Sequence, residues 1–164
     1  MQMLKICLII LSVIFMAACE GETPKSAVDS PNVTVENPAR IDIAPGESAE
    51  VVVAITVASE YHVQANPSAD EFLIPLTIVF DEHDGLHIGK PVYPPPERHH
   101  FEWSPIELFT YSGKVLLPFQ LSVDESITAG DRLLTGTLRY QACSYFICRP
   151  PKQADVRLAV RIVQ

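Results

Sequence analysis

The alternation of apolar and polar residues with a period of two dominates the chain after residue 32. It is clearest over 50–57, where every second residue is a valine or an isoleucine, and this predicts a strand with one buried face. A turn signal, Pro45-Gly46-Glu47-Ser48, comes just before this strand. Weaker stretches of the same kind predict further strands over Arg40–Ile43, Tyr61–Ala65, Leu73–Phe80 and Val115–Val123.

The last two predicted strands, 133–141 and 155–163, have the most regular alternation and can pair as a hairpin. No stretch of useful length has the period and the caps of a helix. Pro75 and Pro118 lie in two of the weaker strands, and because proline cannot donate to a ladder they favour edges, strand starts or bulges. About seven to nine short strands joined by turns predict an all-β fold, an antiparallel immunoglobulin-like β-sandwich.

Residues 1–18 have the pattern of an export signal, with one basic residue, Lys5, before an apolar run that is too short to span a bilayer comfortably. The segment Met16-Ala17-Ala18-Cys19 resembles a bacterial lipobox, which implies cleavage before Cys19 and a lipid on that cysteine. A plain secretory signal cut nearby and an uncleaved anchor are the alternatives. We expect residues 19–32 to be the lipidated cysteine with a flexible polar tether, and residues 33–164 to be one domain.

The chain is acidic, with 12 lysines and arginines against 20 aspartates and glutamates. Loss of residues 1–18 would remove Lys5 alone among the charged residues, which changes the formal net charge from −8 to −9. Nucleic acid is not an expected partner, because a phosphate backbone needs a basic face. Charge does not favour binding to anionic lipid either. We therefore expect the lipid to hold the protein on the periplasmic side of the bacterial cell envelope, at the inner or the outer membrane.

Cys143 and Cys148 lie at the predicted hairpin connection, and neither has another obvious partner in the folded part of the chain. The four residues between them allow the α-carbons to approach the roughly 4.4–6.8 Å of a disulfide. Closing so small a loop stabilises the fold by only about 2 kcal/mol in the chain-entropy estimate. Pro150 and Pro151 hold the outgoing chain extended, so the pair is expected to be accessible. Exposed short-loop disulfides tend to be redox-active, but a structural bridge explains these residues equally well.

The segments that contain the two cysteines, Tyr140-Gln141-Ala142-Cys143 and Cys148-Arg149-Pro150-Pro151, resemble the signature of the N-terminal periplasmic domain of the thiol:disulfide interchange protein DsbD. Weaker similarity in the same order extends over Val33–Gln164. The resemblance implies an immunoglobulin-like fold that transfers electrons through a redox-active Cys143/Cys148 pair without a cofactor. It implies Cys143 as the attacking thiol and Cys148 as the resolving one.

The partners that this resemblance implies would act in trans. A thioredoxin-like domain or a transmembrane thiol reductase would supply electrons, and oxidised envelope proteins would receive them. In the family, a flexible loop with an aromatic residue covers the cysteines until a partner displaces it. By its position along the chain, and not by a motif, the corresponding segment is 97–103, with Phe101 and Trp103 as candidate covering residues; the alternative is a surface loop with its aromatic residues packed beneath it.

The loop between the cysteines, Ser144-Tyr145-Phe146-Ile147, is unusually apolar for a turn that faces solvent. It could dock a partner, because aromatic anchors dominate interface energetics, or Phe146 and Ile147 could fold back on the core. Two other functions remain open at this stage. One is a redox-silent envelope binding module with a structural disulfide, and the other is a metal carrier that uses His99-His100 beside the cysteines. We expect no metal site, because the histidine spacings match no recognised motif and adjacent histidines on a strand point to opposite faces.

Overall fold

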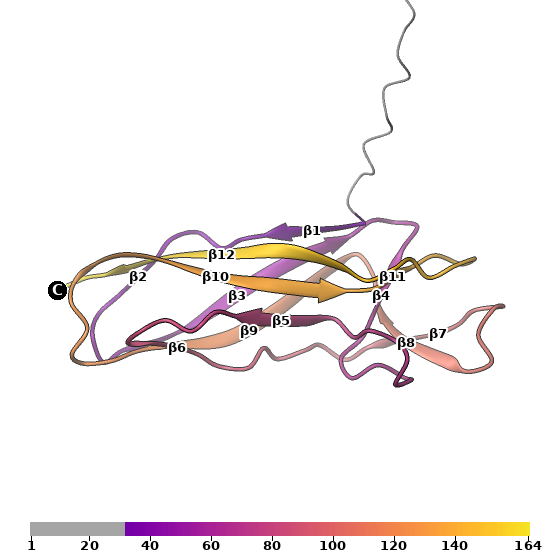
Figure 1. Ribbon diagram of the computed structural model, residues 1–164, viewed down its shortest axis with the longest axis horizontal. Coiled ribbons are helices and arrows are strands. Elements are labelled where there is room, and N and C mark those ends of the chain that lie inside the picture. Colours follow the sequence, from indigo (N-terminus) through magenta and orange to yellow (C-terminus); the bar gives the residue numbers. More distant parts are fainter. Residues whose placement is uncertain (1–31) are drawn as a thin grey trace, which may run out of the picture. The chain divides into compact units, whose positions relative to one another are not determined.

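The computed structural model describes residues 32–164, and its regular elements in that range are all strands (Figure 1). A first antiparallel sheet has the order β1-β3-β9-β6. Its two long central strands pair along nearly their whole lengths, with Val53 opposite Leu117, which confirms the strand predicted over 50–57. The strands of this sheet are β1 (Val33–Glu36), β3 (Ser48–Val57), β9 (Lys114–Val123) and β6 (Leu86–Ile88).

A second sheet has the order β2-β12-β10-β5, and the predicted C-terminal hairpin forms its centre. Leu134 lies opposite Leu158 in this hairpin, and only β2 runs parallel to its neighbour. Gly136 allows the close approach of β5, because an added Cβ would lie 2.7 Å from the Phe80 ring. The strands are β2 (Ile41–Ile43), β12 (Lys152–Ile162), β10 (Gly130–Tyr140) and β5 (Thr77–Phe80).

The hydrophobic core lies between these two sheets. Each sheet turns the apolar side of its alternation inward, so the inner residues of β3 and β9 meet those of β10 and β12 in one cluster. This arrangement confirms the predicted immunoglobulin-like β-sandwich. The most deeply buried side chains of the cluster include Val53, Ile55, Leu117, Leu121, Leu134, Leu138 and Leu158.

The two prolines in the weaker predicted strands have different positions. Pro118 lies inside β9 at a point where the strand has only β3 as a ladder neighbour, because β6 ends at Ile88 opposite Leu121. Val92 donates its N–H to the Pro118 carbonyl at 2.8 Å. Pro75 precedes β5, which begins only at Thr77, so the strand predicted over 73–80 is shorter than expected.

A third, small sheet extends one end of the sandwich in the order β11-β4-β8-β7 (Figure 1). The described part of the chain therefore has twelve strands, more than the seven to nine expected, because several strands of two to five residues show no alternation to recognise. The strands of this sheet are β11 (Ala142–Cys143), β4 (His62–Gln64), β8 (Glu107–Tyr111) and β7 (Glu97–His100).

The predicted signal segment, Cys19 and most of the tether lie outside the described residues, so lipid attachment stays a prediction. Across residues 32–164 the structure contains no helix of the length and apolar character that crossing a bilayer requires.

Candidate functional site

Cys143 and Cys148 form a disulfide near the tip of a tight hairpin at the edge of the third sheet, where Cys143 ends β11. The two residues face each other across an antiparallel bridge, and their α-carbons are 3.9 Å apart, closer than the range expected from the sequence. The Ser144 N–H donates to the Ile147 carbonyl at 2.9 Å, and the Arg149 N–H donates to the Ala142 carbonyl at 2.8 Å. The loop of four residues is thus closed by backbone hydrogen bonds as well as by the two sulfur atoms.

The two cysteines differ in their exposure to solvent. Cys143 is 0% exposed, whereas Cys148 is only half-buried. The side-chain amide of Gln64, also fully buried, donates to the Cys143 Sγ at 3.3 Å. This contact follows from the sheet, because Cys143 pairs with His62 two residues before Gln64 on β4. An incoming sulfur would therefore reach Cys148 more easily than Cys143, and an amide donor already faces the Cys143 sulfur.

Phe101 lies against the cysteine hairpin from the segment that joins β7 to β8. Its side chain is 1% exposed, and its ring centroid lies 5.5 Å from His62 and 6.0 Å from Tyr145, in the loop between the cysteines. Trp103 stacks on Phe101 at 5.3 Å and is partly exposed. The Ser104 N–H donates to the Phe101 carbonyl at 2.9 Å and so tightens the turn after Phe101. Both residues chosen from their position in the sequence therefore lie at the disulfide end of the domain.

The loop between the cysteines is largely open to solvent. Phe146 is 87% exposed and Ile147 is also exposed, so neither folds back on the core. Tyr145 is exposed over much of its surface but places its ring edge on His62, at a centroid distance of 5.7 Å. An apolar surface thus projects beside the disulfide.

The other residues of the cysteine signature hold the hairpin on the sandwich. Tyr140 is buried in the core at the end of β10. The Gln141 side-chain Nε2 donates to the Arg149 backbone carbonyl at 3.2 Å, and the Gln141 side-chain Oε1 accepts the Ile74 N–H at 3.1 Å. The Arg149 guanidinium donates to the Tyr61 hydroxyl at 3.1 Å. Pro150 and Pro151 are exposed and lead directly into β12.

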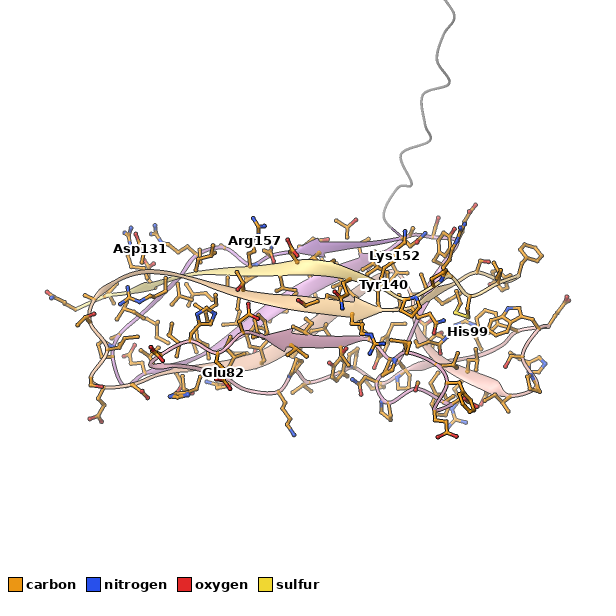
Figure 2. The ribbon with its side chains drawn as sticks, viewed as in Figure 1. Glu82, His99, Asp131, Tyr140, Lys152 and Arg157 are labelled. Atoms are coloured by element: carbon orange, nitrogen blue, oxygen red, sulfur yellow. A yellow bond between two sulfur atoms is a disulfide. The ribbon has the colours of Figure 1, made fainter. Side chains whose placement is uncertain are left out.

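His62, Glu97 and His99 form a polar cluster beneath this aromatic cover, and sequence reasoning did not find it. Their nearest ligand atoms all lie within 4.8 Å of one another. His99 and Glu97 are in contact at 3.1 Å, and the Ser112 hydroxyl donates to Glu97 at 2.8 Å. Figure 2 places His99 at the end of the domain that carries the disulfide. His62 is 35 residues from Glu97 in the sequence, so no local motif links them.

The electrostatics of this cluster favour a neutral His62 and an ionised Glu97. Burial, and then the nearby charge of His99, lower the pKa of His62 from its ordinary value. The hydrogen bonds from His99 and then from Ser112 lower the pKa of Glu97. His100, next along β7, is exposed while His99 is partly buried, which agrees with opposite faces for these adjacent residues.

The fold and the site together define a class, an immunoglobulin-like sandwich with a disulfide in a surface hairpin. The family described as "Thiol:disulfide interchange protein DsbD, N-terminal" matches residues 30–159 of the chain. This match covers most of the sequence, and the chain belongs to that family. No curated protein matches the chain.

Two solved structures are similar to this chain at low sequence identity. The N-terminal periplasmic domain of ScsB from Proteus mirabilis is 16% identical, with a TM-score of 0.50 over 77% of this chain and 44% of that one. The chain therefore spans less than half the length of that ScsB structure. The reduced DsbD N-terminal domain of Neisseria meningitidis is 18% identical, with a TM-score of 0.45 over 73% of this chain and 86% of that one.

Proposed function

We propose that this protein exchanges thiols and disulfides in the periplasm through Cys143 and Cys148. The observation that carries the proposal is the asymmetry of the two sulfurs in an exposed hairpin, where one faces a buried amide and the other is within reach of solvent. A disulfide that served only as a staple would need neither this asymmetry nor an aromatic cover. Family membership supports the same chemistry.

The exposure of the pair favours the reverse of the roles that the resemblance implied. A donor thiolate attacks Cys148 Sγ, so the bond to Cys143 breaks and a mixed disulfide forms at Cys148. Cys143 leaves as a thiolate that the Gln64 amide stabilises at 3.3 Å before it takes up a proton. The donor's second thiol then attacks its own sulfur in the mixed disulfide and releases Cys148. Two electrons and two protons pass to the pair, and the reverse sequence passes them to an oxidised acceptor.

Phe101 is proposed to cover the pair when no partner is bound. Its ring packs on His62 and on Tyr145 of the loop between the cysteines, so a partner that docks on this loop would displace it. The exposed Phe146 and Ile147 would then contact that partner. This order of events would protect the reduced pair from random oxidation while leaving it open to a docked protein.

The partners follow from the same chemistry and from the family. A thioredoxin-like domain or a transmembrane thiol reductase would supply electrons, and oxidised envelope proteins would accept them. A lipid on Cys19 would hold the domain at a membrane near both kinds of partner.

Single-cysteine variants test the proposed roles directly. The full chain with Cys7 and Cys19 replaced by serine would carry either Cys143→Ser or Cys148→Ser, and each variant would be mixed with an oxidised thioredoxin-like protein. The proposal predicts that Cys143→Ser, which leaves Cys148 free, forms the mixed disulfide at least about tenfold faster than Cys148→Ser. The variant that lacks both cysteines is the control and forms none.

The alternative outcomes separate the rival accounts. Faster reaction of Cys148→Ser would restore Cys143 as the attacking thiol and contradict the assignment made from exposure. No reaction by either variant, with the fold intact, would leave a structural bridge in a redox-silent binding module.

A further inference from the structure

The His62, Glu97 and His99 cluster has an arrangement that its hydrogen bonds do not explain. Glu97 and His99 are two residues apart on β7 and so share a face of the third sheet. His62 reaches the same place from β4, and its ring centroid lies 4.6 Å from that of His99. The sheet therefore brings two imidazoles and one carboxylate together from strands that lie two apart.

His62 is the unusual member of this cluster. It is only 7% exposed, and neither of its ring nitrogens has a hydrogen-bond partner among the described residues. Buried polar atoms are costly when unpaired, so two such atoms in one side chain require an explanation. A metal ion would satisfy the one ring nitrogen that binds it, because a neutral imidazole nitrogen is a good ligand.

The donor set selects the kind of metal. Two histidines and one glutamate, with a fourth position left for water, are a zinc combination, whereas calcium and magnesium prefer oxygen ligands alone. Zinc–nitrogen distances of about 2.0–2.1 Å place tetrahedral ligand atoms roughly 3.3 Å apart. The ligand atoms here lie within 4.8 Å, so small rotations of Glu97 and His99, both partly exposed, would close the gap. Ser112 already donates to the Glu97 carboxylate and would orient it as a ligand.

We propose that His62, Glu97 and His99 bind a zinc ion beside the disulfide, with water as the fourth ligand. The site also has a consequence for the cover, because Phe101 follows His99 by two residues and packs on His62. An ion that joins β7 to β4 through these histidines would hold Phe101 in its covering position. The zinc-bound protein would thus keep its disulfide more protected than the metal-free protein.

Zinc titration of the oxidised full chain tests the site without help from the cysteine pair. Cys7 and Cys19 would be alkylated first, so no free thiol can bind the metal, and calorimetry would follow added Zn²⁺. We expect one ion per chain and a zinc-dependent rise in the thermal midpoint. His99→Ala and Glu97→Gln should each weaken zinc binding at least about tenfold and remove that rise. His100→Ala, at the exposed neighbouring position, is the matched control and should leave both unchanged.

One further readout keeps the test independent of folding defects in a variant. Addition of zinc should shift the ring resonances of His62 and His99 in the unmodified protein and leave those of His87 in place. Absence of binding, or equal weakening by His100→Ala and His99→Ala, would overturn the proposal. The disulfide stays closed throughout, so either result leaves the proposed exchange chemistry untouched.

Discussion

Removal of the Phe101 ring should open the disulfide to small reductants. Opening the covering segment exposes a side chain that is now 1% exposed, and such burial is worth roughly 1.5–3 kcal/mol. The ring contacts with His62 and Tyr145 add about 0.5–1.5 kcal/mol each. Taking the sum of the lower values, ~2.5 kcal/mol, Phe101→Ala raises the open population by about 60-fold, because each 1.4 kcal/mol is about a factor of ten.

The assay is the rate of disulfide reduction by excess dithiothreitol, quenched by alkylation. Trp103, the one tryptophan of the chain, stacks on Phe101 and gives an independent fluorescence signal for the open segment. We expect at least a tenfold faster reduction in Phe101→Ala. Phe72→Ala is the matched control, because Phe72 is 84% exposed and its removal should change the rate little. Equal rates in wild type and Phe101→Ala would show that the ring only packs against its neighbours and does not cover the disulfide.

Three further substitutions test other parts of the account. Gln64→Leu removes the amide that faces the buried sulfur, so reduction of the disulfide should slow by about tenfold, consistent with ~1.5–3 kcal/mol for a hydrogen bond to a charged group. Quenched alkylation measures the rate of reduction, and a rate within twofold of wild type counts against this role of Gln64. Gly136→Ala places a Cβ 2.7 Å from the Phe80 ring and should lower the free energy of unfolding by about 1–3 kcal/mol in urea, whereas a loss near zero would mean that β5 can move away. Hydrogen bonds from Lys114, and then from Thr56, lower the pKa of Glu36, so its stabilising contribution is complete above the unfolded pKa and is lost as pH falls through the folded pKa. Lys114→Met should raise that pKa towards its ordinary value in an NMR titration, and an unchanged pKa would contradict the assignment.

The long strands could be predicted from the sequence because their burial repeats with the period of the backbone. Leu134 and Leu158 lie in stretches of eleven residues with one apolar face, so both the strands and their hairpin followed from the pattern. The strands of the third sheet could not be found in this way. β11 has two residues and β4 has three, and their pairing depends on tertiary contacts rather than on alternation.

Some residues of the site could also be predicted from the sequence, and others could not. The cysteine signature is local, so the pair was evident before the fold was known, and the position of Phe101 followed from order along the chain. The unequal exposure of Cys143 and Cys148 could not be read from the sequence, because it arises from pairing with β4. The contact from Gln64 and the cluster around His62 also require the fold, since they join residues that are 35 or more positions apart.

The reduction potential of the Cys143–Cys148 pair tests the central claim most directly. It would be measured by titration with glutathione and dithiothreitol, with alkylation of the thiols as the readout. The account predicts a potential within reach of thioredoxin-like donors, between about −270 and −180 mV. A potential below about −300 mV would identify a structural disulfide and contradict the proposed exchange.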